Sequence, residues 1–389
     1  MAKHDHKTKD GPRTRAGHRV HRWLLVAGGV AVLLVAAAIF AAVRAATLPA
    51  TAFYAFYVNW DNSSYRALSS HLSDISTLVP EWYHVGTSGS LTQDNSDAQA
   101  KALALIRAER PGLRITPIVN DIDKKTGNWD SQEVAGLLHD PASRAKLADD
   151  IVAMVRANRF HGVNIDFEGL PTSSSGDLVA FMADLHDRAH PLGLEVSQDV
   201  SIADPTFDLP ELAKHVDYLI PMMYDEHWST SGAGPIASQS WYEDGLSQLF
   251  KQVPASKVIV AFGGYGFEWR TGSKNAKNVS FAQSIATASA VKTTIELNTA
   301  SLNPTFSRTG HSTWLLDAVS AFNEIAFGRR FPVHGFALWR LGGEDPALWR
   351  VVRKRDSLSA QVAQSLTTPK RSIRYDATRK RIVAEKIQP

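Results

Sequence analysis

His161-Gly-Val-Asn164-Ile-Asp166-Phe-Glu168-Gly-Leu-Pro171 is the most informative stretch of this 389-residue chain. Successive side chains of a β-strand point to opposite faces, so Asn164, Asp166 and Glu168 share one face. The apolar residues between them share the other face. We therefore expect a strand that packs under helices on one side, presents a row of polar groups on the other, and ends at a Gly-Leu-Pro loop.

Strand-like and helix-like segments alternate on both sides of this stretch. We expect eight strands, at Phe53–Asn59, Trp82–Ser88, Arg114–Asn120, His161–Glu168, Leu194–Val200, Asp217–Tyr224, Lys257–Phe262 and Val333–Arg340. The clearest helical patterns are Asp97–Glu109, Arg144–Asn158, Gly176–His190, Ser238–Gln252 and Trp314–Phe327. Several strands are apolar almost throughout, as parallel strands buried on both faces are.

This alternation predicts an α/β fold, a (β/α)8 TIM barrel over residues 52–352. A doubly wound open sheet is the alternative, but no Gly-rich phosphate-binding loop follows the first strand. The segment Gly266–Thr313 is too long for an ordinary strand–helix connection, and it predicts an insertion before the last strand. Residues 353–389 lack apolar periodicity and carry ten Lys/Arg against three acidic residues, so we expect a partly ordered basic tail.

The N-terminal region has the pattern of a membrane anchor. Trp23–Val43 is a run of 21 residues without a charge or a proline, and as a helix it would span about 31 Å at ~1.5 Å per residue. Residues 1–22 carry a net charge of +5, which places them in the cytoplasm and everything beyond a spacer at 44–51 outside the membrane. A secretory signal peptide cleaved near Arg44 is the alternative.

Composition excludes several classes of site. Cysteine is absent, so disulfides, thiol nucleophiles and Cys-ligated metals are ruled out. The body, residues 23–352, carries a net charge of −9, which argues against a nucleic-acid partner. A metal-ligand spacing such as H-E-x-x-H is absent from four candidate histidines, which are His84, His227, His311 and His334. We therefore expect neither a metal nor another cofactor.

The two carboxylates of the central stretch restrict the chemistry. Asp166 and Glu168 are roughly 6.7 Å apart along the strand and project the same way, so they cannot flank a glycosidic bond from opposite sides. One acid with a supporting carboxylate suits a substrate that supplies its own nucleophile, such as the N-acetyl group on a sugar's C2. Asp166 would also raise the pKa of Glu168 and keep it protonated. A buried polar network that fixes the barrel register is the structural alternative.

The stretch resembles the Asp-x-Asp-x-Glu strand of glycoside hydrolase family 18, the chitinase-like hydrolases, in which the final Glu is the acid/base. Four further segments are similar to the first, sixth, seventh and eighth strands of that family: Phe56–Trp60, Pro221–Trp228, Tyr265–Trp269 and Gly335–Trp339. The resemblance covers about residues 52–352. Its nearest branches are the spore-cortex and cell-wall hydrolases, and the hydrolase-like module that accompanies a polysaccharide deacetylase and a glycosyltransferase in fusion proteins.

This resemblance implies roles for particular residues. Glu168 is expected to be the acid/base, with Asp166 and Tyr224 as its catalytic partners, Asp225 as a contact to the acetamido group and Trp339 as the floor beneath the sugar. The other expected substrate-binding residues are Asn164, Tyr57, Asn59, Asn120, Met222, Tyr265 and Trp269. The family has Asp where this chain has His161 and Asn164. Losing the charge at Asn164 is expected to let Asp166 ionise more readily.

Together these observations predict a membrane-anchored, extracytoplasmic glycoside hydrolase. It would cleave a β-linked polysaccharide containing N-acetylglucosamine, with retention and with assistance from the substrate. A polysaccharide deacetylase or a glycosyltransferase is a candidate partner. The alternatives are a non-hydrolytic glycan-binding or assembly module of an exopolysaccharide or cell-envelope system, and an envelope scaffold that acts through the basic tail.

Overall fold

The computed structural model describes residues 50–123 and 126–389. The expected anchor Trp23–Val43, the basic segment before it and most of the spacer lie outside these ranges. Within the described ranges, no helix combines the length and the apolar character that crossing a membrane requires.

Eight parallel strands form a closed α/β barrel, as predicted. In barrel order they are β1 (Ala52–Val58), β2 (Thr77–Val85), β5 (Ile118–Asn120), β8 (Gly162–Asp166), β9 (Glu195–Val200), β10 (Tyr218–Pro221), β11 (Ile259–Gly263) and β17 (Gly335–Trp339). β17 pairs with β1, and two parallel bridges between β10 and β11, at Leu219–Val258 and Met222–Ala261, close the ring. Four minor strands lie beside β2 or in the loop after β5. β3 (Leu91–Gln93) and β4 (Arg114–Ile115) pair with β2, and β6 (Ile122–Asp123) pairs with β7 (Asn128–Trp129).

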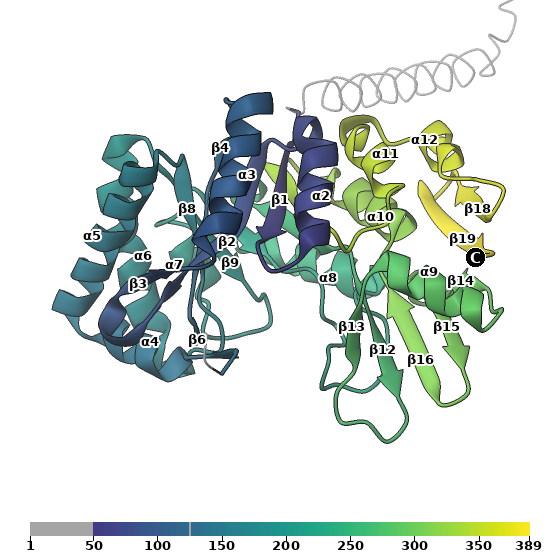
Figure 1. Cartoon of the computed structure of the whole chain (residues 1–389), viewed down its shortest axis with the longest axis horizontal. Coiled ribbons are helices and arrows are strands. Elements are labelled where there is room, and N and C mark those ends of the chain that lie inside the picture. The colour runs from purple at the N-terminus through teal and green to yellow at the C-terminus, as the bar shows by residue number, and fades with distance from the viewer. Residues whose placement is uncertain (1–49, 124–125) are drawn as a thin grey trace, which may run out of the picture. The chain divides into compact units, whose positions relative to one another are not determined.

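Helices follow the strands and cover the outside of the barrel (Figure 1). They are α2 (Asn62–His71), α3 (Ser96–Glu109), α4 (Ser131–His139), α5 (Pro141–Asn158), α6 (Ser175–Ala189), α7 (Leu209–Leu212), α8 (Gln239–Leu249), α10 (Ala318–Gly328) and α11 (Leu348–Val352). Several begin at side-chain caps; for example, the Asp140 carboxylate accepts a hydrogen bond from the Ser143 backbone at the start of α5, and Pro141 is the first helical residue. Several expected boundaries were wrong. For example, β2 begins at Thr77, five residues before the expected Trp82. Trp314 belongs to a strand, and α10 begins four residues later at Ala318.

Strand alternation divides the core into an inner and an outer layer. Tyr54 and Phe56 of β1 lie in a small apolar cluster inside the barrel. Val163, Ile165 and Phe167 lie in the large cluster between strands and helices, as predicted for the outer face of the central strand. The polar face of β8 lies among other polar groups, because Asn164 is hydrogen-bonded to Ser197 and Asp199 of the adjacent strand.

The insertion lies between the seventh and eighth barrel strands and is an antiparallel sheet with one helix. Its elements are β12 (Gly266–Arg270), β13 (Lys277–Val279), α9 (Phe281–Ala290), β14 (Ile295–Leu297), β15 (Pro304–Arg308) and β16 (His311–Leu315). The expected position of the insertion is thereby confirmed.

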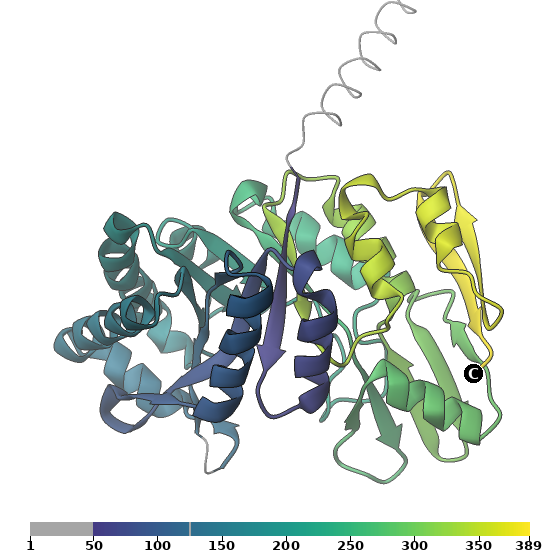
Figure 2. The same ribbon diagram turned by 45° about the horizontal axis from the view of Figure 1, so that its top comes forward.

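The expectation of a partly ordered tail was wrong. Residues beyond 353 form α12 (Ala360–Ser365) and the hairpin β18 (Arg371–Asp376) and β19 (Arg381–Ile387). β19 pairs with β14, so the hairpin completes a seven-stranded sheet with the insertion. Figure 2 shows these two strands beside the strands of the insertion. The physical reason is that β19 buries the apolar side chains of Ile382 and Ile387, while Lys386 is exposed and the buried Glu385 is paired with Arg371.

A buried arginine fixes this hairpin to the barrel. Nη2 of Arg371 lies 2.6 Å from Asp345 and 3.4 Å from Asp317, and Nε lies 3.0 Å from Glu385. Asp317 also caps α10, and Asp345 follows β17. The Asn323 side chain adds two hydrogen bonds to the backbone of Ile382. One guanidinium therefore compensates three buried carboxylates from different segments.

We expect Arg371→Ala to lower the free energy of unfolding by about 3–5 kcal/mol, because it leaves buried carboxylates without their cation. Arg374→Ala is the matched control on the same strand, since Arg374 is exposed, and it is expected to change stability by no more than ~0.5 kcal/mol. Urea unfolding followed by circular dichroism measures both. Equal stabilities for the two variants would contradict this role for Arg371.

Candidate functional site

A cavity of about 420 Å³ opens at the C-terminal ends of the barrel strands. Its wall contains carboxylates, aromatic rings and small residues: Asp166, Glu168, Asp199, Ser201, Ile202, Ala203, Met222, Tyr224, Asp225, Glu226, Trp228, Trp241 and Trp339. This is the end of the barrel where loops of parallel α/β folds build their active sites. Six of the residues expected to bind substrate or act in catalysis line it: Asp166 and Glu168 from the β8 segment, Met222, Tyr224 and Asp225 from the segment after β10, and Trp339 from β17.

Close packing of β8 against β9 sets the position of the carboxylates. At Gly162 a Cβ atom would lie only 2.1 Å from the carbonyl oxygen of Glu195, so only glycine allows the strands to approach this closely. In the resulting register Asn164 is opposite Ser197, and Ser197 Oγ donates a hydrogen bond of 2.8 Å to the Asn164 side chain. Asn164 Nδ2 in turn donates one of 2.7 Å to Asp199.

Asp166 and Asp199 form a buried pair of acids beside Asn164. Each has one oxygen, Oδ1, that finds no hydrogen-bond partner among the described residues. Burial raises the pKa of both carboxyls well above the usual range, and the charge of Asp199 is the next contribution to the pKa of Asp166. The pair therefore holds at least one proton at a pH where an exposed Asp is ionised.

This pair overturns the expectation that Asp166 ionises more readily because Asn164 is neutral. The charge missing at Asn164 is supplied from the adjacent strand by Asp199, which the sequence analysis did not identify. Asp199 could have been identified from the alternation of Ser197 and Asp199 on an expected strand, which is the same pattern as that of Asn164 and Asp166 on β8. Which strands are adjacent, however, is a property of the closed barrel.

Glu168 follows the end of β8 and is kept partly protonated near neutral pH. Burial raises its pKa to about 7, with further contributions from Asp121, Asp225 and Asp204. Oδ1 of Asp121 accepts a hydrogen bond of 3.1 Å from the Glu168 backbone, which fixes the turn, and burial raises the pKa of Asp121 to about 7 as well. A carboxyl with these properties can donate a proton at neutral pH and later accept one.

The facing wall comes from the segment after β10. Met222 and Tyr224 line the cavity, and burial raises the pKa of Tyr224, so the phenol remains a hydrogen-bond donor. Asp225 has a backbone φ of 61° and accepts a hydrogen bond from the hydroxyl of Tyr265. Burial raises the pKa of Asp225 to about 6. The wall thus offers a phenol and a carboxyl that face Glu168.

Trp339, at the end of β17, separates this cavity from a second one. The second cavity has a volume of about 280 Å³ and a polar wall: Asp61, Ser63, Tyr265, Asn278, Ser280, Gln283, Trp339, Arg340, Gly342 and Gly343. The ring of Phe56, from the inner face of β1, packs edge-on against Trp339 at 5.3 Å between centroids. Trp228 and Trp60 are exposed aromatic rings, at 49% and 57% of their surface. Rings that support a flat sugar face are thus present along one side of the barrel mouth.

Six expected substrate-binding residues do not line the main cavity: Asn164, whose hydrogen bonds are given above, and Tyr57, Asn59, Asn120, Tyr265 and Trp269. Tyr57 lies in the outer layer, where its ring packs edge-on against Trp82, because β1 turns Tyr54 and Phe56 inward instead. Asn59 donates a hydrogen bond of 3.1 Å to the Asp94 backbone, Asn120 donates one of 3.0 Å to Glu81, and Trp269 donates one of 3.0 Å to the Ser231 backbone. Tyr265 lines the second cavity and positions Asp225.

Within the described ranges, one group of His and acidic side chains has ligand atoms close enough together to hold a metal ion, and its members lie outside the cavity wall. The cavity wall itself combines buried carboxyls with aromatic rings. This arrangement can hold a neutral, hydroxyl-rich ligand against aromatic faces while a carboxyl delivers a proton.

Comparison with known proteins agrees with this arrangement of barrel and carboxylates. The model of glycosyl hydrolases family 18 matches residues 52–343, and the chain therefore belongs to this family. It is 20% identical over 351 residues to a Bacillus subtilis protein called uncharacterized glycosylase YvbX, covering 86% of this chain and 98% of the relative. It is 23% identical over 294 residues to the cortical fragment-lytic enzyme of Bacillus subtilis, covering 69% and 67%. The fold is similar to a chitinase from Chromobacterium violaceum, with a TM-score of 0.72, 22% identity, and 80% and 100% coverage.

The Asp166–Asp199 pair predicts that stability falls as the pH rises from acid to neutral. A carboxyl whose pKa is higher in the folded than in the unfolded state makes the folded state bind more protons, so the free energy of unfolding decreases as the pH rises above the unfolded pKa near 4. We expect Asp199→Asn to reduce this decrease by on the order of 1 kcal/mol. Urea unfolding at pH 5 and pH 8 measures it. Glu109→Gln, at an exposed site, is the control, and a wild-type pH dependence in Asp199→Asn would contradict the pairing.

Proposed function

We propose that this chain hydrolyses a β-linked polysaccharide that contains N-acetylglucosamine, by substrate-assisted catalysis with retention. The observation that carries the proposal is Glu168, a carboxyl whose pKa of about 7 lets it donate a proton, with Asp166 and Asp199 in the same cavity wall. Asp166 projects from the same strand face as Glu168, so it does not flank a glycosidic bond from the opposite side as a separate nucleophile would. Relatives whose names describe chitin or spore-cortex hydrolysis support this substrate class.

In the proposed mechanism Glu168 donates its proton to the oxygen of the scissile bond as the bond to the anomeric carbon breaks. The carbonyl oxygen of the substrate's acetamido group attacks the same carbon and forms a cyclic oxazolinium ion. Glu168 then accepts a proton from water as the water attacks that carbon, which opens the ring and gives net retention.

The neighbouring groups stabilise the charged intermediate. Asp166 is placed to accept a hydrogen bond from the acetamido N–H, and Tyr224 and Asp225 contact the other side of this group. A proton held by the Asp166–Asp199 pair can reside on Asp199 as the positive charge develops, which leaves Asp166 anionic where the charge forms. Trp339 provides the apolar face beneath the sugar ring.

Glu168→Gln should reduce cleavage by at least ~10²-fold, because glutamine can neither donate nor accept the proton. The full chain is incubated with β-1,4- and β-1,6-linked N-acetylglucosamine oligomers and with peptidoglycan, and the products are identified by mass spectrometry. The assay is run on both sides of pH 7, since only protonated Glu168 acts as the acid. Glu109→Gln is the matched control at an exposed glutamate.

Near wild-type cleavage by Glu168→Gln would rule out the assignment. A glycan-binding or assembly module is the second candidate function, and the replacement of a family Asp by Asn164 favours it. This candidate predicts that the wild-type chain binds the oligomers without cleaving them at any pH tested, with similar affinity in Glu168→Gln.

We further propose that the run Trp23–Val43 anchors the barrel on the outer side of the cell membrane, next to an envelope polysaccharide and to a deacetylase or glycosyltransferase that acts on the same polymer. Its support is the uncharged length of the run and the basic segment before it. Leu33→Arg combined with Leu34→Arg is expected to release the chain from membranes, because each central arginine disfavours insertion by ~2.5–3.5 kcal/mol. Leu33→Ile with Leu34→Ile is the control, and sedimentation after an alkaline wash is the measurement. Release of the control, or retention of the arginine variant, would contradict the anchor.

A further inference from the structure

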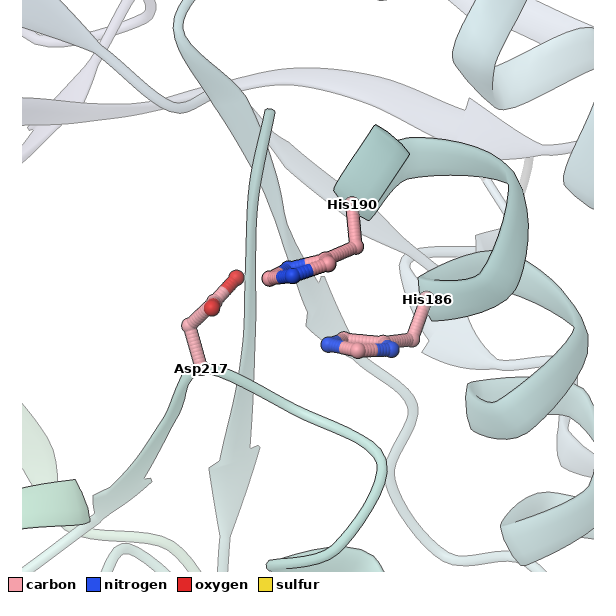
Figure 3. A group of neighbouring side chains, drawn as sticks. All are labelled: His186, His190 and Asp217. Atoms are coloured by element: carbon pink, nitrogen blue, oxygen red, sulfur yellow. The ribbon is translucent and has the colours of Figure 1, made fainter. Parts of the chain in front are cut away.

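A second cluster of reactive side chains lies at the N-terminal ends of the barrel strands, the opposite end from the cavity. His186 is in the last turn of α6, His190 directly follows α6, and Asp217 directly precedes β10. Figure 3 shows the two imidazole rings one above the other, with the Asp217 carboxylate directed at the edge of the His190 ring. None of these residues lines the cavity, so the proposed hydrolysis leaves this cluster without a role.

The geometry of the cluster follows from the helix and from one backbone hydrogen bond. His186 and His190 are four residues apart, which places them on the same helix face, and their ring centroids are 4.8 Å apart with an interplanar angle of 20°. Oδ2 of Asp217 accepts a hydrogen bond of 2.8 Å from the Val196 backbone, so the carboxylate is fixed relative to β9. One ligand atom from each of the three side chains lies within 4.8 Å of those of the other two.

We propose that His186, His190 and Asp217 form a binding site for a divalent transition-metal ion of the zinc class. Two imidazole nitrogens and a carboxylate oxygen are donors that this class of ion prefers. Ligand atoms at ~2.0–2.2 Å from a tetrahedral ion are ~3.3–3.5 Å apart, so closure requires the present separations to shorten by about an ångström. His190 is exposed and His186 half-buried, and both can make this adjustment by side-chain rotation.

The groups around the cluster are of mixed charge. Burial lowers the pKa of His186, Asp217 and Asp187 act against this, and His190 and Lys257 act with it. The ammonium of Lys257 is held by the carbonyl oxygens of Ala213 and Val216, at 2.6 and 2.9 Å. These carbonyls partly neutralise its charge and keep it directed at the backbone.

The position in the fold indicates what the metal does. Three protein ligands would leave one coordination position open to water. In barrels of this kind, however, active sites lie at the C-terminal ends of the strands, and groups at the N-terminal ends contribute to stability. A metal here joins the end of α6 to the segment that enters β10 and so fixes one helix to the strand two positions further along the barrel. We therefore assign it a stabilising role, independent of polysaccharide cleavage.

The test uses the full chain, stripped of metal and titrated with Zn²⁺ alone. Bound zinc is counted after equilibrium dialysis, and the thermal midpoint is recorded with and without zinc, because an ion that binds only the folded state raises it. We expect His190→Ala and Asp217→Asn each to bind one zinc ion fewer, or to bind it at least ~10–100-fold more weakly, as even loss of an outer-shell partner does. The zinc-dependent rise in the midpoint should disappear with it.

The matched control is His139→Ala. His139 is an exposed histidine that pairs with one carboxylate, Asp177, at 3.0 Å, so it offers a His–Asp pair without the second imidazole. His4, His6, His18 and His21 are present in every variant, and zinc bound there cancels in the comparison. Oligosaccharide cleavage by His190→Ala should match that of the wild type.

The proposal is overturned if His190→Ala binds zinc with the stoichiometry, affinity and thermal shift of the wild type, or if His139→Ala loses as much. Substitution with Co²⁺ gives an independent measurement, since its visible spectrum reports the ligands directly. A wild-type cobalt spectrum identical to that of His190→Ala would also overturn the proposal. Failure of the Glu168→Gln experiment would leave this result unaffected, because the two sites share no residue.

Discussion

The burial of several carboxyl groups inside one barrel is the constraint on which the catalytic end of this structure depends. In the part of the chain that the structure describes, the main influences on the pKa values of Asp166 and Asp199 include no cation. Asn164 is opposite Ser197 across β8 and β9, and Asn120 is opposite Asp166 across β5 and β8. These registers bring Asp166 level with Asp199 on neighbouring strands. An interior of low dielectric cannot hold both as anions, so protons remain bound there. The pKa of Glu168, at the mouth of the barrel, is raised in the same way, by burial and by nearby acids.

At the insertion, in contrast, a cation lies among the buried carboxyl groups. There the carboxyls Asp317, Asp345 and Glu385 surround a guanidinium, Arg371. Burial raises the pKa of Asp345 and of Glu385, and the positive charge of Arg371 acts against this. The difference matches what each region does. A compensated cluster fixes the arrangement of segments, whereas acids that share protons can change their charge during a reaction.

The sequence predicted those features that depend on local periodicity. The inner and outer faces of β8 follow from alternation along the strand, and the parallel barrel follows from the alternation of strands and helices. The insertion follows from the length of the segment Gly266–Thr313. What it missed depends on contacts between distant segments. Asp199 gains its role only because β9 adjoins β8, and His186 and Asp217 meet only when α6 packs beside the entry to β10.

Two errors have local physical causes. Tyr57 was expected at the substrate because it lies in a motif-like segment, but the pleat of β1 places Phe56 inward and Tyr57 outward. Residues 353–389 were expected to be a solvated tail because Lys and Arg are frequent there. In a two-stranded hairpin half of the side chains face solvent, so a high charge density is compatible with a buried face made by residues such as Ile382 and Ile387.

The pairing of β14 with β19 has a consequence for the order of folding. Ile295 lies opposite Ile387, so the chain between them, which includes α10 and the last barrel strand, must close as one long loop before this pair can form. Loop-closure entropy makes such a pairing slow relative to hairpins. Until it forms, β14 has an unpaired edge of the kind that recruits strands from other molecules. At high concentration, refolding therefore competes with exchange of this hairpin between two copies of the chain.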